Sequence, residues 1–228
     1  MSLPIPTTSQ ADHLKGILHL SKETPWVSTN ALAAHVQSKP ASVTGMVKVL
    51  ESQGWVTHRA YRGVALTEDG RRWAVGLVRS HRLWEVFLSD CLGFAWHEVH
   101  EMAEQLEHIG QGELIERLDR FLGHPQWDPH GDPIPNAQGV LPLRQRVFSV
   151  DDLPHNAWAE VVGMHDAKDA FLLHLDALGI FCGLRFQVLR LFDFDRSLEV
   201  EYSDGKRFIW TTETARNLMF ELISMDHE

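Results

Sequence analysis

The sequence predicts a mainly α-helical fold with a β-rich carboxy-terminal domain, and three observations support this prediction. Apolar residues recur at helical spacing as far as about residue 122. Five prolines and three glycines then interrupt residues 123–143, too many for regular structure. Residues 149–225 alternate strand-like runs with turn signals, as in AEVVGM, FQVLRLF, LEVEYS and KRFIWT. A chain of 228 residues is long enough for two or three small domains.

The amino-terminal region predicts three helices followed by a β-hairpin. The first helix spans about 8–22, with Thr8 or Ser9 as its cap. The run VSTNALAAHVQSKPASVTGMVKVLESQGW predicts two more helices, and Pro40 is well placed at the start of the second. WVTHRAYRGVALT alternates like two short strands around a turn. This layout is typical of a winged helix-turn-helix DNA-binding domain, which we place at residues 1–72, although the same layout also builds protein-interaction modules.

Three further amphipathic helices are predicted at about 68–90, 97–109 and 112–122. Consecutive amphipathic helices outside a DNA-reading unit commonly pair two subunits. We therefore predict a helical dimerisation domain at 73–140, which includes the proline-rich linker. The alternating segment that follows, with a short helix at about 168–178, predicts a small β-barrel of the SH3-like type at 149–228.

Charge is distributed unevenly along the chain, whose formal net charge is −10. Residues 1–82 hold 10 Lys and Arg against 5 Asp and Glu, whereas the remainder holds 11 against 26. The positive segment favours an anionic partner such as nucleic acid. The acidic remainder is either a solubilising surface or a region with a different function. Only two cysteines, no signal-peptide layout and no apolar run of ~18 residues lead us to expect a cytoplasmic protein that does not enter a membrane.

The densest cluster of chemically active side chains is HEVHEMAEQLEH, at residues 97–108. One helical face within it carries two histidines and two glutamates, at His100, Glu104, Glu107 and His108. The preceding helix carries a matching pair one turn apart, His81 and Glu85. Unpaired buried carboxylates are costly, so a shared cation is one interpretation, and a solvated acidic helix face is the other. A zinc-protease motif is excluded, because its two histidines must stand four residues apart and His97 and His100 stand three apart.

Several blocks of the sequence resemble the diphtheria-toxin-repressor family of metal-dependent transcriptional repressors, most of all its manganese transport regulator branch. The blocks extend over about residues 8–136 and read SVTGMVKVLESQGWV, YRGVALTEDGR, VRSHRLWEVFL, EVHEMAEQLEH and LGHPQWDPHGDPIP. The tail resembles the family's SH3-like, FeoA-type domain. The resemblance implies a homodimer, not an enzyme, that binds Mn(II) or Fe(II) as corepressor, occupies palindromic double-stranded DNA operators and silences metal-uptake genes. It implies no small organic substrate. The alternative is a metal-independent winged-helix regulator, or an interaction protein with an acidic helical surface.

The resemblance also implies the metal ligands. The main site takes four residues, namely Asp12, Glu104, Glu107 and His108. An adjacent site takes His81, Glu85 and His100, and in the manganese branch His81 joins the main cluster. Carboxylates stand at Asp12 and Glu104 where iron-type members have sulfur ligands, which favours Mn(II), with Fe(II) second and Co, Ni, Cd or Zn ions as surrogates. Lys15 stands where the manganese branch has a further carboxylate, which argues against a two-manganese cluster of that design. In the tail, Asp169 is the one candidate for a further ligand.

On the DNA-binding side, the resemblance places three small residues of the recognition helix in the groove, Ala41, Ser42 and Thr44. A methyl group and two hydroxyls suit contact with thymine methyl groups and hydrogen bonds to base edges. Four basic residues are expected to bind phosphate, which positions the protein without specifying sequence, and these are Lys39, Lys48, Arg59 and Arg62.

Overall fold

The structure, a computed structural model, describes five stretches of the chain, residues 5–21, 24–109, 112–144, 146–165 and 168–224. The chain divides into two compact units. The amino-terminal unit comprises residues 1–84, 103–124 and 134–141, and the carboxy-terminal unit comprises 85–102, 125–133 and 142–228. Among the described residues, none of the helices is both long enough and apolar enough to cross a membrane.

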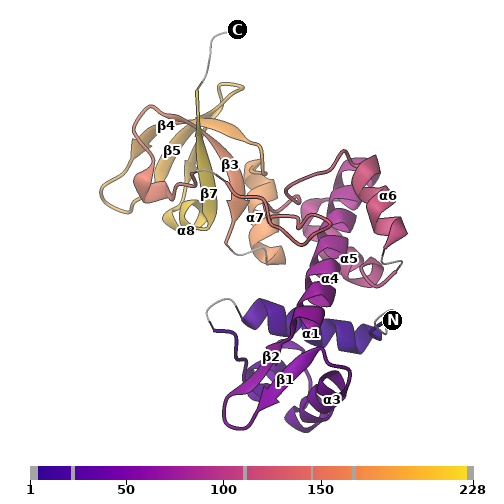
Figure 1. Cartoon of the computed structure of the whole chain (residues 1–228). Coiled ribbons are helices and arrows are strands. Elements are labelled where there is room, and N and C mark those ends of the chain that lie inside the picture. Colours follow the sequence, from indigo (N-terminus) through magenta and orange to yellow (C-terminus); the bar gives the residue numbers. More distant parts are fainter. Residues whose placement is uncertain (1–4, 22–23, 110–111, 145, 166–167, 225–228) are drawn as a thin grey trace. The chain divides into compact units, whose positions relative to one another are not determined.

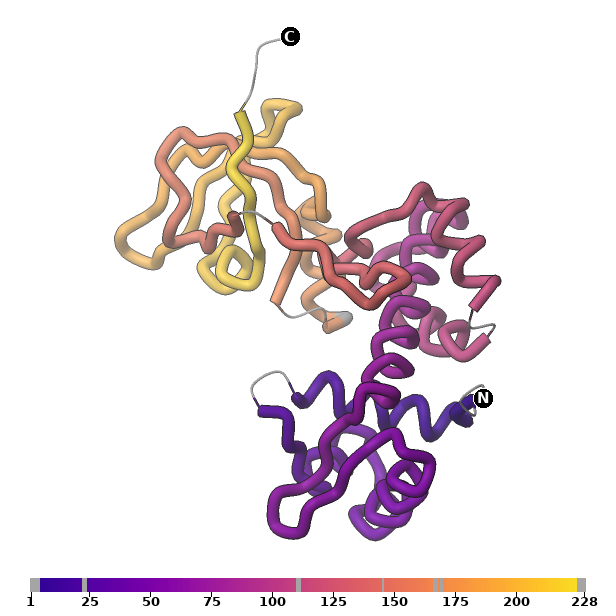
Figure 2. Tube along the Cα trace, in the orientation of Figure 1, coloured from indigo at the N-terminus to yellow at the C-terminus, as the bar shows by residue number. Residues whose placement is uncertain are grey.

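The amino-terminal unit begins with the predicted helices and hairpin. They are α1 (Thr8–Leu20), α2 (Thr29–His35), α3 (Pro40–Ser52), β1 (Val56–Arg59) and β2 (Gly63–Leu66). The cap of α1 is Thr7 rather than Thr8 or Ser9, because Thr7 and Gln10 satisfy each other's backbone N–H groups in a capping box. Pro40 opens α3 as predicted. Figure 2 traces the hairpin that follows α3, in which Val56 pairs with Leu66 and Arg59 with Gly63.

One apolar core holds these elements together. Its fully buried residues come from α1, α2, α3 and the hairpin, among them Leu14, Ile17, Leu32, Leu50, Trp55 and Val64. The next helix, α4 (Glu68–Val86), starts against this core. A Cβ atom on Gly70, in the first turn of α4, would lie 1.9 Å from the carbonyl oxygen of Trp55, so only glycine fits there. The hairpin and the start of α4 are therefore packed backbone against backbone.

The other helices of this region are α5 (Trp96–Leu106) and α6 (Glu113–Phe121). A π-helical turn, η1 (Phe87–Cys91), follows α4 directly, so the predicted helix at 68–90 is present with an altered last turn. Within the amino-terminal unit, buried Arg79 of α4 donates to Glu116 and Asp119 of α6. The helix predicted at 97–109 ends at Leu106, and the N–H of Ile109 turns back to the Leu106 carbonyl oxygen. Glu107 and His108 consequently lie in a turn after α5.

The carboxy-terminal unit is built on a five-stranded antiparallel sheet with the order β6-β5-β4-β3-β7 (Figure 1). The strands are β3 (Trp158–Met164), β4 (Arg185–Leu191), β5 (Leu198–Tyr202), β6 (Arg207–Trp210) and β7 (Leu218–Ile223). Four of them match the predicted runs. The edge strand β7 was missed because LMFELI places apolar residues on both of its faces instead of alternating.

Two helices and an aromatic cluster complete this unit. The helices are α7 (Asp169–Leu178) and α8 (Thr212–Arg216), and a short 3-10 helix, η2, spans Val150–Asp152. Phe186 packs against Trp210 and Phe220, with ring centroids 4.7 and 5.5 Å apart. Residues 125–133 of the predicted linker belong to the same unit, where the Arg144 guanidinium lies 3.7 Å from the Trp127 ring centre.

Candidate metal centre

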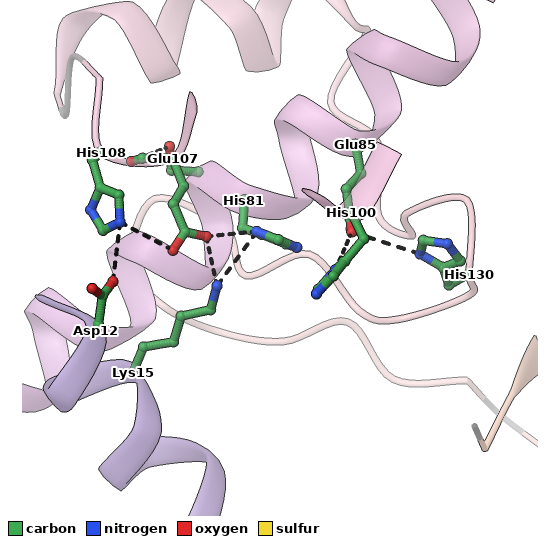
Figure 3. Close-up of polar contacts among 9 residues, drawn as sticks. Asp12, Lys15, His81, Glu85, His100, Glu107, His108 and His130 are labelled. Atoms are coloured by element: carbon green, nitrogen blue, oxygen red, sulfur yellow. Dashed lines mark hydrogen bonds and ion pairs between the residues drawn. The ribbon is translucent and has the colours of Figure 1, made fainter. Parts of the chain in front are cut away.

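Three predicted ligands meet in the amino-terminal unit. Asp12 projects from α1, while Glu107 and His108 belong to the turn after α5 (Figure 3). The Nε2 atom of His108 lies 3.1 Å from Asp12 Oδ1 and 3.7 Å from Glu107 Oε1. One ligand atom from each of the three residues lies within 4.8 Å of the others, which is close enough for all three to contact one metal ion.

Glu107 is the most buried member, with 2% of its side chain exposed. Its Oε2 atom accepts a hydrogen bond from Lys15 Nζ at 2.6 Å and lies 2.6 Å from His81 Nδ1. Its backbone carbonyl oxygen accepts a hydrogen bond from Ser80 Oγ at 3.1 Å. Burial on its own raises the pKa of Glu107, but the hydrogen bond from His81 and the charge of Lys15 outweigh burial and hold that pKa below its ordinary value. Glu107 is therefore an ionised carboxylate despite its burial.

Asp12 has the opposite electrostatic character. Partial burial raises its pKa above the ordinary value, the positive charge of His108 opposes that rise, and the negative charge of Glu107 adds to it. The two carboxylates therefore repel each other, and Lys15 and His108 offset only part of this repulsion at Asp12. A divalent cation between them would relieve this repulsion, and oxygen and imidazole donors together suit Mn(II) and Fe(II). The residues present thus fit the metal that the sequence implied.

The other residues predicted as ligands lie in two places. Glu104 is exposed on α5, and within the described stretches it is not part of the group formed by Asp12, Glu107 and His108. His81 contacts Glu107 in the amino-terminal unit. Glu85 and His100 lie together in the carboxy-terminal unit, where His100 Nδ1 is 3.1 Å from Glu85 Oε1. Asp169 begins α7, but its side chain lies outside what the structure describes.

A group that the sequence did not suggest surrounds Glu85. Asp128 and His130 bring ligand atoms within 4.8 Å of a Glu85 oxygen and of each other, and all three residues are buried. The Nε2 atom of His130 lies 2.8 Å from the Trp96 carbonyl oxygen, which can only accept, so His130 donates there, and its Nδ1 atom lies 3.8 Å from Glu85 Oε1 (Figure 3). The only sequence signal was the spacing of Asp128 and His130 in a proline-rich stretch that predicted a linker.

The seven predicted DNA contacts all lie on the surface. Lys39, Ala41, Ser42, Thr44 and Lys48 are exposed on and beside α3, and Arg59 and Arg62 are exposed on the hairpin. Thr44 Oγ1 donates its proton to the Pro40 carbonyl oxygen at 2.9 Å, so its hydroxyl is left to accept from a partner. The Arg59 guanidinium is held 4.9 Å from the centre of the Trp26 ring.

Known protein families match both the amino-terminal helices with their hairpin and the helices that follow. Residues 7–64 match the N-terminal DNA binding domain of iron dependent repressors, and residues 67–136 match the metal binding and dimerisation domain of the same proteins. The diphtheria toxin repressor of Corynebacterium glutamicum is 31% identical over 173 residues, which cover 73% of this chain and 75% of that protein. The chain belongs to the iron-dependent repressor family. The family resemblance predicted from the sequence is therefore confirmed.

Other members of the iron-dependent repressor family extend the comparison. A structure described as a manganese-dependent transcriptional repressor in complex with manganese is similar over 94% of this chain and 100% of that one, with a TM-score of 0.76 and 32% identity. It confirms the predicted architecture, including the β-rich domain. The iron-dependent repressor IdeR of Mycobacterium tuberculosis is 32% identical over 123 residues, so the chain matches about half the length of that relative, 54%.

Proposed function

We propose that the chain is a Mn(II)-dependent transcriptional repressor in which Asp12, Glu107 and His108 hold the corepressor ion. The convergence of these three side chains carries the proposal, because it joins α1 of the DNA-binding region to the turn after α5. The bound ion would offset the remaining repulsion between the carboxylates of Asp12 and Glu107. Glu104 and His81 complete the predicted ligand set. Fe(II) is the second candidate, and Co, Ni, Cd or Zn ions are expected to act as surrogates.

The residues of the chain provide the mechanism. Asp12 stands on the helix that packs behind the DNA-reading elements, so a tie from Asp12 to Glu107 and His108 restricts how α1 is oriented. In a homodimer, two such restricted units present their α3 helices at one spacing, and a palindromic operator requires half-sites about one helical turn apart. Metal binding therefore selects the DNA-competent population, and DNA binding reciprocally tightens metal binding.

The group around Glu85 is proposed as a second metal position. Asp128 and His130 supply its other ligands, with His100 beside Glu85. We further propose that the protein works in the cytoplasm on metal-uptake genes, and that it catalyses no reaction. The proline-rich stretch would then serve the metal centre in addition to connecting domains.

A binding-site selection tests the proposed function. Random duplex DNA is exposed to the metal-free protein with and without Mn(II), and the duplex enriched with Mn(II) is then titrated by fluorescence anisotropy. The proposal expects enrichment of a palindrome and a strong dependence of affinity on Mn(II). A metal-independent winged-helix regulator would enrich the same DNA in both conditions, and that outcome would overturn the metal-dependent function.

A further inference from the structure

The two carboxylate oxygens of Glu107 face two different sets of partners (Figure 3). The Oε1 atom faces His108, whose Nε2 lies 3.7 Å away and also contacts Asp12. The Oε2 atom faces Lys15 and His81, whose nitrogens each lie 2.6 Å away. A carboxylate with donors on both oxygens can bind two cations at once, one on each side. A further carboxylate, from Asp12, lies on the Oε1 side, where it contacts the same His108 nitrogen.

Lys15 fills the Oε2 side. It stands three residues after Asp12 on α1, so both side chains leave the same face of that helix. Its ammonium lies 2.6 Å from Glu107 Oε2 and 3.5 Å from His81 Nδ1, and only 24% of its side chain is exposed. An ammonium group has three donors and no acceptor, so it acts toward a carboxylate as a cation does, yet offers no ligand atom to a metal.

We propose that the Lys15 ammonium is the second cation of this centre, so that the centre takes one divalent ion, on the Oε1 side with Asp12 and His108. This inference depends on the proposed metal-dependent function. A second divalent ion on Oε2 would have to share that oxygen with a positive charge already bonded to it. Because Lys15 is covalently part of α1, the competing charge is present at every metal concentration. The number of ions is thus set by the sequence and not by the metal supply.

Electron paramagnetic resonance of the full-length protein with Mn(II) tests this stoichiometry. Two Mn(II) ions that share a carboxylate are exchange-coupled and give a spectrum distinct from that of single ions. An ion held elsewhere in the chain, without a shared carboxylate, contributes only a single-ion signal. With excess Mn(II), the wild type is expected to show single ions alone. Lys15→Glu, which replaces the competing charge with a ligand, is expected to show the coupled pair and one additional ion per chain by equilibrium dialysis.

Matched variants separate charge from shape. Lys15→Met keeps roughly the length of the side chain and removes the charge without adding an oxygen ligand, and it is expected to show no coupled pair. Lys15→Gln supplies a neutral ligand oxygen and provides a second arm if Lys15→Glu does not fold, as judged by thermal melting. A coupled pair in Lys15→Gln would support the inference, and single ions alone in a folded, metal-loaded Lys15→Glu would overturn it.

Measurements on the wild type distinguish a failure of the Lys15 inference from a failure of the proposed metal-dependent function. A coupled Mn(II) pair in the wild type means that Lys15 moves away from Glu107, which overturns the inference and leaves the metal-dependent function intact. If the wild type retains no Mn(II) in dialysis and binds DNA equally without it, the proposed function itself fails.

Discussion

The Nε2 atom of His108 lies 3.1 Å from Oδ1 of Asp12, and this contact joins two segments that are distant in the sequence. One segment is the first helix of the DNA-binding region, and the other is the turn that follows α5. A side-chain contact of this kind is weak at a partly exposed position, since 45% of the Asp12 side chain is accessible. A metal ion bound at the same place would connect α1 to the turn after α5 far more strongly.

Removing a proposed ligand is expected to weaken Mn(II)-dependent DNA binding without unfolding the chain. In His108→Ala the ion loses its only nitrogen donor from the group formed with Asp12 and Glu107, so the apparent Mn(II) affinity falls roughly tenfold or more, as for other disrupted metal sites. Gel shifts across a Mn(II) titration measure the change. Glu101→Ala, which removes an exposed glutamate of the preceding helix α5, is the matched control and keeps wild-type behaviour. Unchanged metal dependence in His108→Ala would remove His108 from the centre.

The group around Glu85 is expected to bind its own ion. Asp128 Oδ1 accepts from the backbone N–H groups of His130 and Asp132, so Asp128→Asn keeps an acceptor for this turn while removing the charge that a cation needs. A ligand that binds only the native state raises the thermal midpoint. The rise in midpoint with Mn(II) should therefore shrink in Asp128→Asn, whereas the melting of the metal-free protein stays close to that of the wild type. An equal rise in both proteins would exclude Asp128 as a ligand.

Two substitutions on α3 are expected to have different effects, one on the sequence specificity of DNA binding and the other on its overall affinity. Ser42→Ala removes an exposed hydroxyl predicted to reach a base edge, which lowers preference for the selected operator by about 1–3 kcal/mol. Lys48→Ala removes a predicted phosphate contact, which weakens all duplexes alike and lowers the slope of log affinity against log salt by about 1. Anisotropy titrations at several salt concentrations measure both effects. Ser52→Ala, at the far end of the same helix, is the control, and Mn(II) affinity should not change in any of them.

Gly70 is expected to be essential for packing in the DNA-binding region. A methyl group there would meet the Trp55 carbonyl oxygen at 1.9 Å, so Gly70→Ala forces α4 away from the hairpin and costs about 1–3 kcal/mol of unfolding free energy. Gly76→Ala, on the same helix, meets nothing within 4 Å and is expected to stabilise the protein by up to ~1 kcal/mol through helix propensity. Urea unfolding compares the two variants, and a neutral Gly70→Ala would contradict the observed contact.

The order of elements followed from local patterns, whereas the site depended on contacts between distant segments. Pro40 and the periodicity of residues 41–50 predicted α3 because helix starts and apolar stripes are local properties. The face shared by His100 and Glu107 was also a local inference, and a shared face does not determine which side chains of other helices each residue meets. His100 meets Glu85, and Glu107 meets Lys15 and His81. Those pairings arise from how helices pack, which spacing within one helix does not determine.

The same limit explains why the sequence did not suggest Asp128 and His130 as metal ligands. Their neighbours in the sequence are prolines and glycines, which indicate a turn but not what the turn approaches. Only the packing of residues 125–133 within the carboxy-terminal unit brings them to Glu85. By contrast, the assignment of Asp12, Glu104, Glu107 and His108 to one site came from family resemblance. The structure brings ligand atoms of Asp12, Glu107 and His108 within 4.8 Å of one another, and the site itself stays a prediction.

Two consecutive residues of α4 contact Glu107 at different points. Ser80 donates a hydrogen bond to the backbone carbonyl oxygen of Glu107, and His81 contacts the Glu107 carboxylate. The position of Glu107, a proposed ligand, therefore depends on where α4 lies along its own axis. Substitutions that slide α4, such as those at the fully buried Leu77 or Leu83, would retune the concentration of metal to which the switch responds without altering any coordinating atom.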